Sequence, residues 1–92
     1  MSEITLWPAR ATDTHVAQTA NALTQAIAEH GAPNRFTAGE LFRTYGGPRP
    51  SQIGLVLRNR LEALSEAVGY EVTWERLASH QPMWVIVGKT RA

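Results

Sequence analysis

The sequence predicts an α+β fold in which three helices precede a β-hairpin. Apolar side chains recur at helical spacing in three segments, residues 14–30, 38–45 and 52–68. The period then changes, because residues 70–76 alternate between polar and apolar side chains and residues 83–88 form a short apolar run. The chain has 92 residues and no cysteine, so it has room for one hydrophobic core and forms no disulfides.

The chain divides into an arm and a domain. Residues 1–11 are expected to form an N-terminal arm, and residues 12–92 the folded domain. A segment exposed only to solvent rarely carries a tryptophan. We therefore expect Trp7 either to dock on the domain or to contact a partner.

The first helix is defined by its two ends and by one apolar stripe. Asp13 or Thr14 is suited to cap its N-terminus, because a short side-chain oxygen can accept from the free backbone N–H groups there. Gly31 and Pro33 end it. The expected stripe consists of Val16, Ala20, Leu23 and Ile27.

The second helix has the clearest start signal in the chain. Thr37 and Glu40 have the spacing of a capping box, in which each residue's side chain accepts from the other's backbone N–H. Phe36 and Leu41 flank this box as a hydrophobic staple. The helix ends at a Gly46-Gly47 turn.

The third helix is expected to be the longest after the first. Pro50 prevents a helix before Ser51, which is a suitable cap, and Gly69 ends the helix. The expected core of the whole domain is Leu23, Ile27, Leu41, Phe42, Ile53, Leu57, Leu61 and Val85. In the hairpin that follows, Trp74 and Trp84 are expected to face each other across the strands or to pack on the third helix.

Positive charge is concentrated in the middle of the chain. The whole sequence has a net charge of +1, yet residues 34–61 carry five arginines against Glu40 alone, a net charge of +4. The segments on either side, residues 1–33 and 62–76, are both acidic. A polyanion, if the protein binds one, is therefore expected to meet the middle third.

The order helix, short helix, tight turn, longer helix and hairpin resembles that of a winged helix-turn-helix domain over residues 13–89. Phe36–Leu41 (FTAGEL) looks like the start of the family's second helix, and Arg49–Arg58 (RPSQIGLVLR) like that of its recognition helix. Met83–Val87 (MWVIV) looks like the strand leaving the wing. Small phage and plasmid replication or regulatory proteins contain similar domains. The resemblance implies a three-helix fold with a C-terminal hairpin wing, whose recognition helix enters the DNA major groove.

The residues expected to contact DNA lie on two helices and the hairpin. Arginine suits guanine, and glutamine or asparagine suits adenine, while hydroxyl and guanidinium groups near a helix N-terminus suit phosphate. The candidate DNA-binding residues are Arg43, Arg49, Ser51, Gln52, Leu55, Arg58, Asn59, Arg76, His80 and Gln81. With so few cations, affinity is expected to be modest and salt-dependent, and a homodimer would be needed for a tight site.

One exposed apolar residue supports a different reading. Leu55 lies in the middle of the exposed face, where it can pack on a thymine methyl or form part of a protein contact. Glu62 and Glu66 extend that face with negative charge. The alternative function is therefore a winged-helix interaction module that binds a protein partner around Leu55, such as a phage-type inhibitor or a complex subunit.

Other function classes have little support in the sequence. His15, His30 and His80 are far apart and lack carboxylates at ligand spacing, so no metal site is expected. No serine, histidine and acid converge on one predicted surface, so we expect neither an enzyme nor a cofactor. The chain carries no apolar run of membrane-spanning length and no signal-peptide pattern. We therefore expect a cytoplasmic protein without small-molecule substrate or membrane partner.

Overall fold

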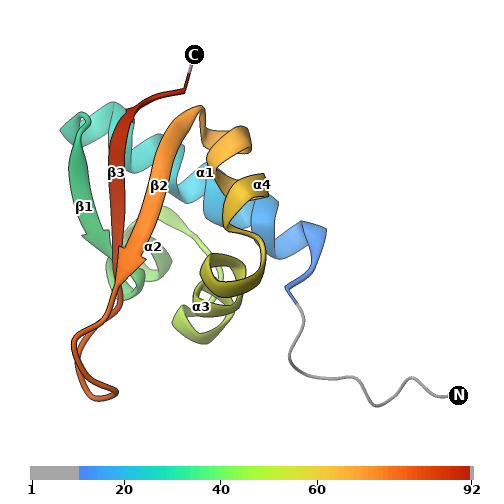
Figure 1. The fold of residues 1–92 in the computed structure, drawn as a ribbon, viewed down its shortest axis with the longest axis vertical. Coiled ribbons are helices and arrows are strands. Elements are labelled where there is room, and N and C mark those ends of the chain that lie inside the picture. Colours follow the sequence, from blue (N-terminus) through green and yellow to red (C-terminus); the bar gives the residue numbers. More distant parts are fainter. Residues whose placement is uncertain (1–10, 92) are drawn as a thin grey trace, which may run out of the picture.

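The computed structural model describes residues 11–91, which form four helices and three strands (Figure 1). In chain order these are α1 (Asp13–His30), β1 (Asn34–Thr37), α2 (Ala38–Tyr45), α3 (Pro50–Asn59), α4 (Leu61–Val68), β2 (Tyr70–Glu75) and β3 (Trp84–Thr90). The predicted α+β class is confirmed. Most of the expected N-terminal arm, including Trp7, lies outside the described residues.

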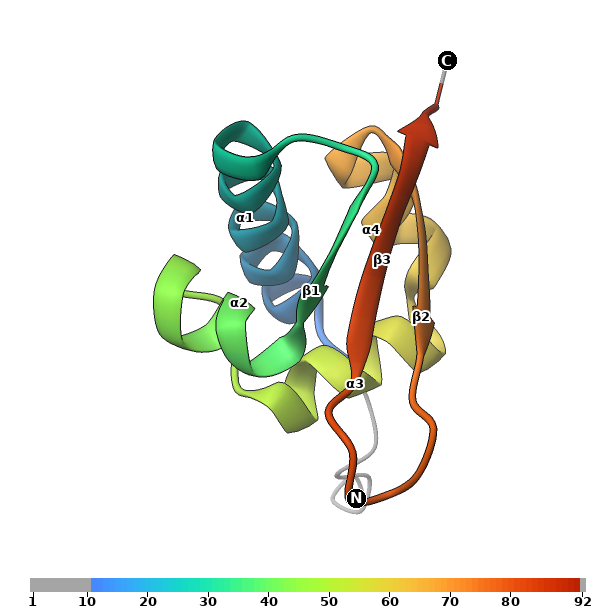
Figure 2. The same ribbon diagram turned by 90° about the vertical axis from the view of Figure 1, so that its left-hand side faces the viewer.

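The strands form an antiparallel sheet in the order β1-β3-β2 (Figure 2). Val87 of the central strand lies opposite Asn34 of β1 and Val72 of β2. Because side chains alternate along a strand, the register sorts them onto two faces. The inner face carries Phe36, Val72, Trp74, Val85 and Val87. The outer face carries Arg35, Thr73, Trp84 and Ile86.

The helices cover the inner face of the sheet and leave the outer face open (Figures 1 and 2). Five of the expected core residues are fully buried there, namely Leu23, Leu41, Ile53, Leu57 and Val85. Ile27 and Leu61 are partly buried and pack against the same core. Phe42, by contrast, is 41% exposed, so its assignment to the core is wrong. Ala38, Leu41 and Tyr45 occupy the buried face of the short helix α2 and leave Phe42 outside.

The helix caps agree with the sequence at one helix and differ at another. The Thr37 hydroxyl accepts from the backbone N–H of Glu40 at 3.1 Å, as predicted. The reciprocal bond from the Glu40 carboxylate is not formed within residues 11–91. At α1 the cap is Thr12, which accepts from the N–H of His15 at 3.1 Å, so the expectation of Asp13 or Thr14 is wrong.

The predicted third helix is two helices, and this is the largest correction to the sequence analysis. The break lies at Arg60, whose φ of −135° and ψ of 35° leave the helical region. The Arg60 guanidinium donates to the Asp13 carboxylate at 2.8 Å and to the carbonyl of Ala11 at 3.4 Å. These partners at the start of α1 are far away in sequence. Residue 60 is neither proline nor glycine, so no helix-breaking residue marks the break, and Arg60 connects it to the start of α1.

Strand β1 was not predicted, and it changes the sheet from a hairpin into three strands. Its four residues were expected to lead into the second helix. Phe36 is both a residue of this strand and a core residue, because it lies opposite Val85 of β3 and is buried. A four-residue strand whose partner lies about fifty residues later carries almost no local signal.

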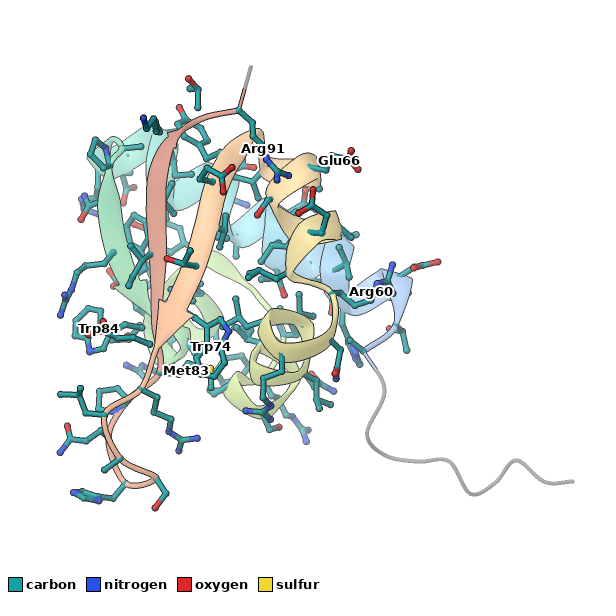
Figure 3. All side chains as sticks on the ribbon, in the orientation of Figure 1. Arg60, Glu66, Trp74, Met83, Trp84 and Arg91 are labelled. Atoms are coloured by element: carbon teal, nitrogen blue, oxygen red, sulfur yellow. The ribbon has the colours of Figure 1, made fainter. Side chains whose placement is uncertain are left out.

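The two hairpin tryptophans lie on opposite faces of the sheet. Trp74 lies opposite Val85 and packs against the core, whereas Trp84 lies opposite Glu75 on the outer face (Figure 3). The Arg35 guanidinium lies 4.4 Å from the centre of the Trp84 ring, a cation–π contact. The expectation that the tryptophans face each other is therefore wrong. No helix within residues 11–91 is long and apolar enough to cross a membrane.

Candidate nucleic-acid interface

A groove of about 470 Å³ lies between the start of α2, the helix α3 and the loop that joins β2 to β3. We call residues 76–82 the hairpin loop. Figure 1 shows α3 and this loop at the same end of the molecule. The groove is lined by Ala38, Gly39, Pro50, Ser51, Gly54, Arg58, Arg76, Gln81, Pro82 and Met83. Four residues predicted for DNA contact therefore meet here: Ser51, Arg58, Arg76 and Gln81.

Two arginines lie over helical glycines at the walls of this groove. An ideal Cβ atom on Gly39 would be only 2.8 Å from Nη1 of Arg43. One on Gly54 would be 3.5 Å from Nη1 of Arg58 and equally close to the terminal methyl of Met83. At Gly39 a larger residue would therefore require the flexible Arg43 guanidinium to shift, whereas the distances at Gly54 are ordinary van der Waals contacts that a Cβ atom would also permit.

The start of α3 differs from the prediction in one respect. Pro50 is the first helical residue and Arg49 takes the cap position, so Ser51 is not the cap. The side-chain oxygen of Gln52 accepts from the backbone N–H of Arg49 at 3.0 Å. That bond occupies the acceptor of Gln52 and leaves its amide NH₂ free to donate. Ser51 and Arg49 are both exposed, and Ser51 faces the groove.

The outward face of α3 carries the remaining predicted contacts on this helix. Arg58 and Asn59 are exposed, whereas Leu55 is half-buried. Leu55 and Asn59 lie outside the lining of the groove. Because the chain breaks at Arg60, Glu62 and Glu66 belong to α4 and not to the helix that carries Leu55. The predicted negative extension of the α3 face is therefore wrong.

The hairpin loop is closed by its own hydrogen bonds. Nε of Arg76 donates to the carbonyl of Gln81 at 3.1 Å, and Nη2 donates to the carbonyl of Ser79. The N–H of Gln81 donates to the carbonyl of Ala78 at 2.9 Å. Arg76 thus lines the groove while it holds the loop in shape. His80 lies exposed in this loop.

Five of the arginines in residues 11–91 fall into two groups by their partners. On the side formed by α1, α4 and β2, Arg60 pairs with Asp13, and Arg91 pairs with Glu62 at 2.9 Å and Glu71 at 3.3 Å (Figure 3). The hydrogen bond to Glu62, together with the negative charges of Glu62 and Glu71, raises the pKa of Arg91 above its usual value. Beside the groove, Arg43, Arg49 and Arg58 have no carboxylate partner within residues 11–91. Among the other cations without a carboxylate partner within residues 11–91, Arg76 lines the groove, whereas Arg35 and Lys89 lie on the sheet.

A polar cluster fixes the far end of α2 to the end of α1. The Tyr45 hydroxyl donates to Oε1 of Glu29 at 2.6 Å and lies 2.9 Å from Nε2 of His30. The hydrogen bond to the Glu29 carboxylate raises the pKa of Tyr45 to about 12, since it favours the protonated phenol. This contact helps set the angle at which α2 presents Arg43 to the groove.

Comparison with protein-family models, with curated proteins and with solved structures found no match. The chemistry of the groove is therefore what indicates a function. Within residues 11–91 no three side chains of histidine, aspartate or glutamate lie close enough together to hold a metal ion.

Residue patterns at the groove contain a signal that the sequence analysis did not use. Gly39 and Arg43 enclose the segment GELFR, and Gly54 and Arg58 enclose GLVLR. Both place an arginine one turn after a glycine inside a helix. Residues four apart in a helix lie on the same face, so this spacing places each guanidinium beside its glycine, and only at Gly39 does a Cβ atom come too close to the guanidinium. Met83 and Pro82 were also missed as lining residues, and nothing local distinguishes them.

Proposed function

We propose that this chain is a winged helix-turn-helix protein that binds double-stranded DNA, as a small transcriptional or replication regulator. In this proposal α2 and α3 form the helix-turn-helix, and α3 enters the major groove. The hairpin loop is the wing and contacts the DNA backbone. The strand order β1-β3-β2 and the position of the loop beside α3 support this assignment.

The observation that carries the proposal is the pair of unpaired arginines at the groove. Arg43 and Arg58 have no carboxylate partner within the described part of the chain, and both lie against glycine backbone beside the groove. An unpaired guanidinium can bind a phosphate or a guanine edge without first breaking an ion pair. The carboxylates that form ion pairs with Arg60 and Arg91 lie on the α1, α4 and β2 side. Glu40 and Glu75 are the carboxylates next in sequence to lining residues of the groove, and neither pairs with an arginine within residues 11–91.

Each groove residue has a role that follows from its chemistry. Arg58, exposed on α3, can donate two hydrogen bonds to guanine, and Asn59 beside it can pair with adenine. Arg43 on α2 contacts a phosphate, and Ser51 near the start of α3 can donate to the next one. Arg76 holds the wing, and its charge adds to the attraction for the backbone.

A binding titration with two matched double variants tests this proposal. We would measure the anisotropy of a labelled duplex of mixed sequence at 50 and 200 mM salt. Arg43→Ala with Arg58→Ala removes two unpaired charges, whereas Arg60→Ala with Arg91→Ala removes two paired ones. We expect the first variant to lose roughly tenfold or more in affinity and the second to change little. Equal losses in both variants would mean that net charge, and not the groove, attracts DNA.

A protein-binding function is the second candidate, and one exposed apolar side chain on α2 favours it. Phe42 is 41% exposed, whereas Leu55 on α3 is half-buried, so the expectation that Leu55 lies exposed on the helix face is wrong. On the DNA reading, Leu55→Ala shifts duplex affinity by at most about 1 kcal/mol. An anchor at the centre of a protein contact commonly costs about 2 kcal/mol or more when it is truncated. Sedimentation of the wild type and Leu55→Ala, alone and with the duplex, separates the two functions.

A further inference from the structure

The hairpin loop carries the most exposed large apolar side chain of the described residues. Leu77 is 85% exposed, twice the exposed fraction of Phe42. A single exposed leucine is common on protein surfaces and needs no explanation by itself. The surroundings of Leu77 are what distinguish it.

Leu77 lies in a loop that is closed by hydrogen bonds. The Arg76 guanidinium donates to the carbonyls of Ser79 and Gln81, and the N–H of Gln81 donates to the carbonyl of Ala78. The side chain of Leu77 takes no part in these bonds and stands exposed beside them. A loop that is already ordered loses little conformational entropy when it enters a ligand.

The charge of the loop favours a polyanion around Leu77. Residues 76–82 contain Arg76 and the exposed His80, but no aspartate or glutamate. The loop also forms one wall of the groove, and Arg58 lies on the opposite wall. Figures 1 and 2 show that the loop projects past α3 at that end of the molecule. A duplex that meets α3 therefore also meets the tip of the loop.

We propose that Leu77 acts as an apolar wedge that enters the minor groove, separates two stacked base pairs and kinks the DNA. This inference rests on the proposed DNA-binding function. Inserted apolar side chains partly unstack a base step, and the bend that results brings more DNA surface against the protein. The step that opens with least energy is pyrimidine–purine, so Leu77 favours sites with such a step beneath the wing.

The experiment compares DNA bending by three proteins on one duplex. The probe is the tightest-binding duplex from a randomised pool, labelled at both ends for energy transfer. We expect the wild type to shorten the end-to-end distance and Leu77→Ala to abolish this change, with a roughly three- to tenfold loss in affinity. Leu77→Phe is the matched control, since it keeps a large apolar side chain and should keep the bend. All three should melt at the same temperature, because Leu77 lies outside the core.

The possible outcomes distinguish a failure of the Leu77 wedge from a failure of the proposed DNA-binding function. If the wild type binds the duplex but bends it no more than Leu77→Ala does, the wedge is wrong and DNA binding stands. If the wild type binds no duplex from the pool, the proposed function is wrong and the wedge with it. If a TA step in the probe can be replaced by a stiff A-tract without loss of affinity, the step preference is wrong, and with it the insertion of Leu77.

Discussion

Arg60 and Arg91 lie against carboxylates on the side formed by α1, α4 and β2, whereas Arg43 and Arg58 lie against glycine backbone beside the groove. The first pair joins distant segments of the chain. Arg60 holds the break between α3 and α4 onto the start of α1, and Arg91 connects β3 to α4 and β2. The second pair joins nothing within the described residues, so its hydrogen-bonding capacity is left for a ligand.

This difference shows why charge counted along a sequence is a poor guide to charge available at a surface. Residues 34–61 carry a net charge of +4, but Arg60, one of the five arginines in that segment, is committed to Asp13. Another, Arg35, lies over the ring of Trp84 on the outer face of the sheet. Arg43, Arg49 and Arg58 remain at the groove. Three predictions test whether the two groups of arginines differ as the geometry indicates, and a fourth tests the cap of the helix that carries Arg43.

Arg58→Ala should have the largest effect on recognition. Because a bidentate contact to guanine distinguishes it from the other bases, we expect discrimination at one base pair to fall by about 1–3 kcal/mol. Competition between duplexes that differ at single positions measures this loss. A uniform loss on every sequence would assign Arg58 to the DNA backbone instead.

Thr37→Ala should cost about 1 kcal/mol in the free energy of unfolding, because the N–H of Glu40 loses its acceptor at the start of α2. Thr12→Ala is the matched control, since Thr12 caps α1 in the same way, away from the groove. Denaturant melts should give similar losses for both variants. Only Thr37→Ala should also weaken DNA binding, because only this cap supports a wall of the groove.

Arg43→Ala should weaken binding to all sequences alike. Each phosphate contact contributes about 0.9 to the slope of log affinity against log salt, so we expect the slope to fall by about that amount. Titrations at several salt concentrations measure it. Arg43→Lys, which keeps the charge, should restore the slope, and failure to do so would place Arg43 on a base and not on a phosphate.

Arg60→Ala should have the smallest effect, confined to stability. Its bridge to Asp13 is partly exposed, with 35% of the arginine side chain accessible, so we expect about 0.5 kcal/mol less free energy of unfolding. A denaturant melt detects this change, and added salt should reduce it. If Arg60→Ala is fully folded but binds DNA more weakly, the division into paired and unpaired arginines is wrong.

Local features of the fold were predictable, and features set by distant contacts were not. The Thr37 cap, the apolar stripe of α1 and the two hairpin strands depend on residues a few positions apart, and each is present in the structure. The break at Arg60 depends on Asp13 and Ala11, and β1 depends on β3. Neither the break nor the strand β1 has a sequence pattern in its own segment that would predict it.

The candidate site divides in the same way. Ser51, Arg58, Arg76 and Gln81 were chosen by residue type, and the structure brings these four residues to one groove. Their contact with DNA stays a prediction. The pairing state of each arginine was not predictable, because it depends on which carboxylates the fold brings close. Phe42 was misplaced because a helix of eight residues gives too few turns to fix the phase of its buried face.

The position of β3 in the centre of the sheet has a consequence for synthesis on the ribosome. The strand order β1-β3-β2 means that β1 and β2 do not pair with each other and share only β3. Residues 84–90 are translated after every helix and after both neighbouring strands. Until translation has passed residue 90, β1 and β2 have no central strand to pair with. The apolar side chains of their inner faces, including Phe36 and Trp74, stay without that neighbour. The sheet can therefore close only after β3 has left the ribosome, and a chain released before β3 would expose two unpaired strand edges to aggregation.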